Sequence, residues 1–168
     1  AGKAVVTAKV KGKTLKCKVT VTKKQATKKN AKTAGKKNTT SDISLQKKVI
    51  SIVNKNREKK GLKALTMDEK LMKAAQDRAK ELTKSFSHTR PNGTSCFTIF
   101  EKYKITPTAS GENIAAGQRS AAAVMDSWMN SPGHKENIMN NRFKKIGVGL
   151  VIVPNDMYSY YWVQMFTE

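Results

Sequence analysis

Two histidines, His88 and His134, are the residues best suited to chemistry in this 168-residue sequence, and both lie among glycine, proline and serine. Between them Glu112 is an acid inside the mostly apolar stretch 111–115. Two imidazoles and one carboxylate on rigid turns are the minimum for a His₂-carboxylate metal site with an open position. The three residues are therefore candidate ligands for a divalent metal. No helical HExxH pairing fixes them, so ordinary surface hydrogen bonding is the alternative.

The same residues also suit hydrolysis. His88 or His134 would act as a general base, Glu112 would orient it or hold a metal, and water would be the nucleophile. Ser87 and Ser131 lie near the histidines, but neither has the glycine pattern of a nucleophile elbow. A serine nucleophile is therefore the less favoured form of this hypothesis.

Small and amide residues flank the three candidate ligands. Asn113 and Asn137 are candidates for hydrogen bonds that orient a carboxylate or an imidazole, and ordinary loop or cap bonding is the alternative. We expect Gly111 and Gly133 to let the backbone turn sharply beside the acid and the second histidine.

Helical and strand patterns that could position these residues begin at Ile43. They end in two strands at 146–153 and 158–166, joined by a turn at 154–156. Helices followed by an antiparallel strand pair favour an α+β sandwich, with the aromatic residues Trp128, Trp162 and Phe166 in its core. Four helices are predicted. The first runs from Ile43 and stops at Gly61, and the second follows a capping box at Thr66–Glu69, in which Thr66 accepts a hydrogen bond from the Glu69 amide. The third is short, from Cys96 to Tyr103, and the fourth is capped by Ser120 and ends at 131–133.

The first 42 residues have a different texture. Apolar and β-branched residues alternate with lysine over 3–23, which predicts a β-hairpin. This pattern resembles the last two strands of a bacterial immunoglobulin-like (BIG2-type) repeat, and the likeness implies a longer protein upstream. Residues 24–42 hold no aliphatic side chain larger than alanine, and we expect a flexible basic linker. The expected domains are thus 1–23, 24–42 and 43–168.

The net charge of +21 is concentrated near the N-terminus, where residues 1–42 hold 13 lysines and one acid, Asp42. Such an arm favours adhesion to anionic polymers such as cell-wall teichoic acid. No aromatic residue interleaves the lysines, so we expect no specific nucleic-acid binding. No apolar run approaches the roughly 20 residues of a transmembrane helix. Cys17 and Cys96 fall in different modules and are expected to be small buried thiols rather than a disulfide.

Residues 43–168 resemble a bacterial CAP (SCP-like) domain, from the superfamily of cysteine-rich secretory proteins, antigen-5 and plant pathogenesis-related proteins. The resemblance implies a three-layer α-β-α sandwich whose central cleft is lined by two histidines and two glutamates and binds zinc or another divalent ion. His88, Glu112 and His134 occupy three of those positions, while Ser131 stands at the fourth. Gln164 is a further candidate for the cleft. The matching segments, in order, are 86–88, 111–114, 128–134, 145–149 and 161–166.

The leading functional hypothesis is a secreted or cell-surface protein whose cleft binds a lipid or peptide-like ligand, with a divalent metal as its only expected cofactor. One alternative is a metal-dependent hydrolase or protease that uses the same cleft. Another is an adhesive cell-envelope module that acts through the basic immunoglobulin-like arm. Each of these places the protein outside the cell or on the cell wall.

Overall fold

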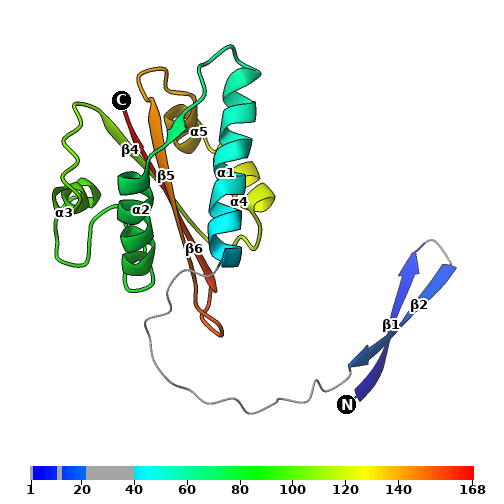
Figure 1. Cartoon of the computed structure of the whole chain (residues 1–168). Helices are drawn as coiled ribbons and strands as arrows, with labels where there is room; N and C mark the ends of the chain where they lie inside the picture. The colour runs from blue at the N-terminus through cyan, green and yellow to red at the C-terminus, as the bar shows by residue number, and fades with distance from the viewer. Residues whose placement is uncertain (1, 11–12, 22–39) are drawn as a thin grey trace. The chain divides into compact units, whose positions relative to one another are not determined.

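The computed structural model describes residues 2–10, 13–21 and 40–168, with side chains described from Asp42 onward (Figure 1). The chain divides into two compact units, Ala1–Gly35 and Lys36–Glu168.

The first unit contains an antiparallel pair of strands, β1 (Gly2–Val10) and β2 (Lys13–Val21). Their register runs from Gly2 opposite Val21 to Val10 opposite Lys13. The predicted hairpin is therefore confirmed, while its kinship with an immunoglobulin-like repeat stays a prediction. Most of the predicted linker, residues 24–39, lies outside the described residues.

The second unit is built on a four-stranded sheet with the order β3-β5-β6-β4. β3 pairs with β5 in parallel, and the other two pairings are antiparallel. The two C-terminal strands lie within two residues of their predicted bounds. The four strands are β3 (Thr66–Met67), β4 (Ser110–Ala116), β5 (Lys145–Ile152) and β6 (Tyr160–Thr167).

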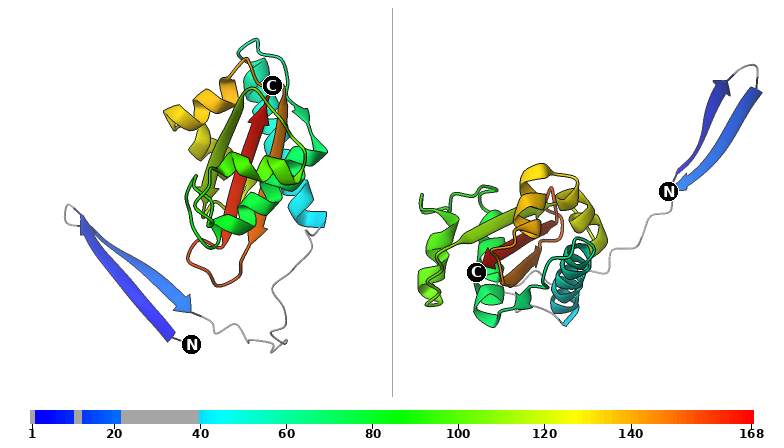
Figure 2. Two further views of the ribbon diagram at one scale, coloured as in Figure 1. Left: turned by 90° about the vertical axis from the view of Figure 1, so that its left-hand side faces the viewer. Right: turned by 90° about the horizontal axis from the view of Figure 1, so that it is seen from above.

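Helices cover both faces of this sheet, so the second unit has three layers (Figures 1 and 2). α2, with the short helices η1 and α3, packs on one face, and α1, α4 and α5 pack on the other. This arrangement is the mixed α+β architecture expected from the sequence. The helices are α1 (Thr40–Glu58), α2 (Glu69–Leu82), η1 (Cys96–Thr98), α3 (Ile99–Lys102), α4 (Ala121–Met129) and α5 (Pro132–Met139).

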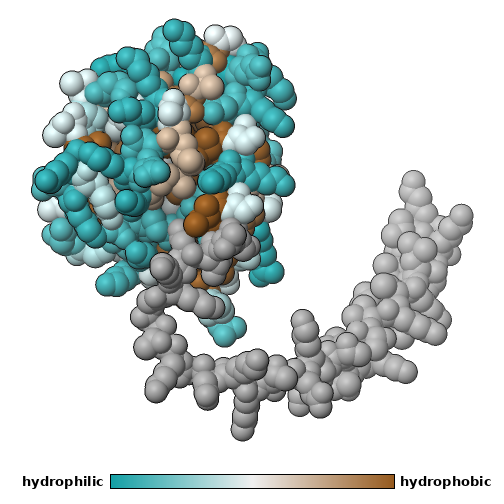
Figure 3. Space-filling model, in the orientation of Figure 1, coloured by the Kyte–Doolittle hydropathy of each residue, from teal (hydrophilic) through white to brown (hydrophobic). Residues whose placement is uncertain are grey.

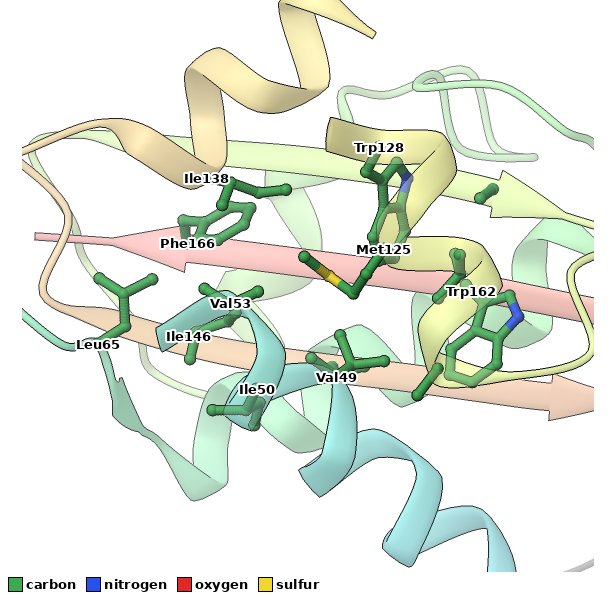
Figure 4. Close-up of a cluster of buried hydrophobic side chains, with 14 of the residues drawn as sticks. Val49, Ile50, Val53, Leu65, Met125, Trp128, Ile138, Ile146, Trp162 and Phe166 are labelled. Atoms are coloured by element: carbon green, nitrogen blue, oxygen red, sulfur yellow. The ribbon is translucent and has the colours of Figure 1, made fainter. Parts of the chain in front are cut away.

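Two apolar clusters hold the layers together, one on each face of the sheet. Figure 4 shows the cluster beneath α1, α4 and α5, in which Trp128 and Phe166 are 1% and 0% exposed. Trp162 belongs to the same cluster and is also buried. The three aromatic residues are core residues, as predicted. Trp162 and Phe166 are four residues apart on β6, and since side chains alternate between the two faces of a strand, both point to the same face of the sheet.

Two glycines of β5 allow α2 to lie unusually close to the sheet. A Cβ atom at Gly147 would stand 2.2 Å from the backbone carbon of Leu71, and one at Gly149 would stand 2.0 Å from the carbonyl oxygen of Ala75. No side chain fits there, so glycine at both positions is a packing requirement.

The start of α2 differs from the prediction. Thr66 lies in β3, and the helix is capped by Asp68, whose side chain accepts a hydrogen bond from the Leu71 amide at 2.9 Å. Thr66 is therefore not the cap. Its amide donates instead to the carbonyl of Lys144 beside β5, and this pairing with a distant strand takes precedence over the local capping pattern.

Two further elements were absent from the sequence prediction. Glu112 lies in strand β4 and not on a turn, and His134 lies in helix α5 and not in a loop. Pro132, read from the sequence as the end of the preceding helix, is the first residue of α5, a position that suits proline because its missing N–H needs no partner there. α1 begins at Thr40, three residues before the expected start, and Gly61 follows its end with φ of 69°.

The surface of the second unit is mostly hydrophilic on the face seen in Figure 3. Within the described part of the chain, no helix is both long and apolar enough to span a bilayer.

Candidate functional site

Edge strand β4 positions the candidate acid. Along β4, Glu112 and Ile114 face α2, while Asn113 faces the layer of α5. β4 is the last strand in the sheet order, so residues on both sides of it lie beside one edge. The site is therefore assembled around a single strand, with one histidine coming from each side.

His88 and Glu112 form the first pair of the site. The Nδ1 atom of His88 lies 2.8 Å from Oε1 of Glu112, and Nε of Arg78 donates to Oε2 at 2.9 Å. The Glu112 side chain is 1% exposed, whereas that of His88 is 59% exposed. Both carboxylate oxygens thus have partners inside the protein, and the imidazole presents its other edge to solvent.

Arg78 holds the loop that carries His88 from α2. Its side chain is fully buried and also donates to the carbonyl of Ser87 at 2.8 Å and to Glu81 at 2.7 Å. Glu81 in turn accepts from Arg90, two residues beyond His88, at 2.7 Å. α2 therefore fixes the chain on both sides of the histidine.

These contacts set the protonation of the pair. The hydrogen bond from Glu112 raises the pKa of His88 and outweighs partial burial, which alone would lower it. Burial alone would lower the pKa of Arg78, but its two carboxylate partners raise it. A cationic arginine therefore stands behind Glu112, and His88 holds its proton more strongly than a free imidazole.

The Cys96 thiol lies beside this pair, and it is buried as predicted. His88, Cys96 and Glu112 each offer one ligand atom, and these three atoms lie within 4.8 Å of one another. Among the described residues, this is the cluster of His, Cys, Asp or Glu side chains that could hold a metal ion. Burial, together with the Glu112 charge, raises the pKa of Cys96 to about 12. The thiol is therefore neutral at physiological pH. The side chain of Cys17 lies outside the described residues.

His134 and Ser131 form the second pair. Nδ1 of His134 lies 2.7 Å from the Ser131 hydroxyl oxygen, so serine contacts this imidazole much as Glu112 contacts the first. Burial lowers the pKa of His134, and the charge of His88 lowers it further. Among the described residues, His134 does not belong to the group formed by His88, Cys96 and Glu112.

Amide side chains tie β4 to the helix that carries His134. Asn113 donates to the carbonyl of His134 and to Oε1 of Gln164, each at 3.0 Å. Asn137 donates to Asn113 at 2.9 Å and to the Glu112 carbonyl at 3.2 Å. Gln164 is fully buried on β6, directly opposite Asn113 of β4. Its side chain therefore lies on the same face of the sheet as Asn113 and on the opposite face from the Glu112 carboxylate.

The two glycines of the motif do not form the sharp turns expected of them. Gly111 lies in β4, where a Cβ atom would stand 2.9 Å from Asn137 and 3.0 Å from Phe143. Gly133 lies in α5 with no atom within 4 Å of a Cβ position. Neither has a positive φ. Gly111 is therefore closely packed against two side chains, and Gly133 is not.

Arg78 is the residue of the site that sequence reasoning missed, together with its partners Glu81 and Arg90. A signal was present, because Arg78 lies at helical spacing within the apolar stripe of α2, between Ala75 and Ala79. A charge at such a position requires a buried partner. The sequence did not say which of the twelve acids that partner is.

A sheet between two helical layers, with the candidate residues His88 and His134 held on opposite sides of its edge strand β4, defines this unit as a three-layer α-β-α domain. The profile of the Cysteine-rich secretory protein family, CAP, matches residues 50–166. The chain belongs to this family.

Known relatives support the same assignment. The chain is 40% identical over 126 residues to the Bacillus subtilis protein YkwD, covering 71% of this chain and 49% of that protein. An extracellular SCP-domain protein of Bacillus anthracis superposes with a TM-score of 0.68 at 24% identity, over 80% of this chain and 45% of that one. An outer surface protein of Borrelia burgdorferi gives a TM-score of 0.69 at 27% identity, over 81% of this chain and 98% of that one. The chain spans about half the length of the two Bacillus proteins.

Proposed function

We propose that this protein acts outside the cell as a ligand-binding CAP protein, and that His88 and His134 hold a divalent metal such as zinc at the ligand site. The extracellular assignment is supported by two structural neighbours, one described as extracellular and one as an outer surface protein. The ligand class we propose is a lipid or a peptide-like chain.

The observation that carries the proposal is the way in which the two imidazoles are held. Each has its Nδ1 atom beside a hydroxyl or carboxylate oxygen, and neither Nε2 atom has a hydrogen-bond partner among the described residues. An oxygen at one ring nitrogen fixes the ring and leaves the other nitrogen for a metal. Imidazole is a preferred ligand of zinc.

Glu112 does not fit the role of a direct ligand. Both of its oxygens have protein partners, and a metal beside it would also face the Arg78 guanidinium. We therefore propose that Glu112 acts through His88, by orienting the ring. With two protein ligands and no nearby free carboxylate, the affinity for zinc is expected to be modest. When bound, such an ion supplies a Lewis acid that polarises a ligand oxygen.

Calorimetry with Zn²⁺ tests this proposal on the full chain. Wild type should bind zinc, and His88→Ala and His134→Ala should each reduce the affinity by at least about tenfold, since each removes one of two ligands. Cys96→Ser is the matched control and should leave the affinity unchanged, because the buried neutral thiol is not a proposed ligand. Equal heats for wild type and both histidine variants would contradict the metal site.

A hydrolase remains the second candidate, and the His88–Glu112 contact favours it. A carboxylate that orients an exposed imidazole with a raised pKa is a common general-base arrangement. We expect a peptide library to be cleaved by wild type and not by His88→Ala if the site is catalytic. If wild type leaves the library intact with each metal added, the result counts against a hydrolase. The proposed zinc site would still stand, because calorimetry tests it independently.

A further inference from the structure

Large apolar side chains are exposed mainly at one end of the second unit. Among the residues whose burial is described, six such side chains are exposed, and four of these lie in or beside the β5–β6 connection. The ring of Phe86, from the loop after α2, lies 6.4 Å from the ring of Tyr158. The connection projects at the end of the sheet (Figures 1 and 2). These four residues form what we call the apolar tip: Phe86, Ile152, Met157 and Tyr158.

The β5–β6 connection is tightly hydrogen-bonded, so the exposure of Met157 is a built feature of the loop. The Val153 amide donates to the Ser159 carbonyl at 2.7 Å, and the Asp156 carboxylate accepts from the Met157 amide at 2.8 Å and from the Tyr161 hydroxyl. Met157 is 86% exposed. A loop with this much internal bonding that still leaves a methionine in water indicates a contact surface.

Two exposed cations lie close in the chain to the apolar tip. Exposed Lys84 is two residues before Phe86, and exposed Arg119 is two residues after Gly117, where an added Cβ atom would stand 3.9 Å from the Tyr158 ring. Two residues span at most about 7 Å, so both cations lie beside the tip. The acid of the loop, Asp156, has internal hydrogen-bond partners.

The lysine-rich part of the sequence joins the second unit at the same end. α1 begins there, as Figures 1 and 2 show. The 18 residues before it, 22–39, contain seven lysines and no acid. The apolar tip therefore lies at the end of the domain to which the most basic segment of the chain is attached.

We propose that the apolar tip docks on an anionic lipid bilayer. Met157, Tyr158 and Phe86 would enter the headgroup region, and the surrounding cations would face anionic headgroups. A few apolar side chains alone bind a membrane weakly, but together with a polybasic segment they give reversible attachment. A soluble anionic polymer would account for the lysines but not for the outward methionine. Met157 and Tyr158 lie on the β5–β6 connection, whereas Phe86 precedes His88 by two residues on the loop after α2. The inference concerns the outward apolar side chains and does not rest on the proposed function.

Co-sedimentation of the full chain with lipid vesicles tests this inference. We expect binding to vesicles of equal parts phosphatidylglycerol and phosphatidylcholine, weaker binding at high salt, and little binding to phosphatidylcholine alone. Met157→Ser should weaken binding at least about fivefold, because it removes the most exposed apolar side chain. Met67→Ser, at an exposed methionine on β3, is the matched control and should have little effect.

A reporter variant separates insertion from surface attraction. In Met157→Trp, the added tryptophan should shift its emission to shorter wavelength on anionic vesicles and be quenched by brominated acyl chains. Binding that Met157→Ser leaves unchanged, or an unquenched reporter, would overturn the inference in favour of charge alone. If Met157→Ser weakens binding to soluble polyphosphate as much as it weakens binding to vesicles, the inference is overturned in favour of an anionic polymer.

Discussion

At the scale of single residues, the site depends on a buried charge pair beneath an exposed histidine. Arg78 and Glu112 have 0% and 1% of their side chains exposed, and they compensate each other. The arginine also fixes the Ser87 carbonyl next to His88. One helical residue thus sets both the charge under the imidazole and the path of its loop.

Arg78→Met should destabilise the second unit strongly, by about 3–5 kcal/mol, because it leaves the Glu112 carboxylate buried without its counter-charge. Urea unfolding monitored by tryptophan fluorescence measures the loss. Arg142→Met, at an exposed arginine, is the control and should change stability by no more than about 0.5 kcal/mol.

A double variant checks that the pair is the cause. Adding Glu112→Gln to Arg78→Met should recover part of the lost stability, since the uncompensated charge is then gone. Strictly additive losses would show that Arg78 acts through packing alone.

At the scale of elements, β4 and β5 place the site by two different means. The carbonyls of Glu112 and Ile114 on edge strand β4 accept hydrogen bonds from Asn137 and Trp128, which attaches α4 and α5 to the edge and brings His134 there. β5 contributes through its two glycines, against which α2 packs. The distance between α2 and the sheet in turn determines whether the Arg78 side chain can donate its hydrogen bond to the Glu112 carboxylate.

Gly149→Ala tests this close packing. A methyl group there would overlap the Ala75 backbone, so we expect a loss of at least about 2 kcal/mol in unfolding free energy. The comparison is Gly133→Ala, where the methyl group meets nothing within 4 Å in a helix and stability should stay level or rise by about 0.5–1 kcal/mol. Similar effects at the two glycines would contradict the assigned difference between them.

At the scale of the whole molecule, the excess positive charge makes the acids on the second unit important for stability. Partial burial alone would raise the pKa of Asp77, but hydrogen bonds from Lys102, Lys80 and Tyr103 hold it well below its usual range. The pKa of Glu81 is lowered in the same way, since Arg90 and Arg78 outweigh its partial burial. Both acids pair with cations that would otherwise repel one another.

Stability should therefore fall in acid. A carboxyl group whose pKa is lower in the folded than in the unfolded chain stabilises the fold above the unfolded value, near 4, and that stability is lost as pH falls toward the folded value. We expect the melting temperature to be level from pH 7 to about 5 and to decrease steadily below about 4. In Asp77→Asn the melting temperature should be lower at neutral pH and its acid dependence shallower. An unchanged acid dependence in that variant would exclude Asp77 as a contributor.

The sequence by itself determined the α+β class, the hairpin, the apolar stripe of α2 and the buried aromatic residues, and it singled out the two histidines and Glu112 as candidates. These features follow from local periodicity and from residue types, which are visible in one chain. The tertiary structure decided that Thr66 pairs as a strand, that His134 lies in a helix, that Gly111 and Gly149 are packing positions, and that Arg78 is the partner of Glu112. Each of those outcomes depends on which distant segment lies alongside, and pairing of that kind leaves no periodic signal in the sequence.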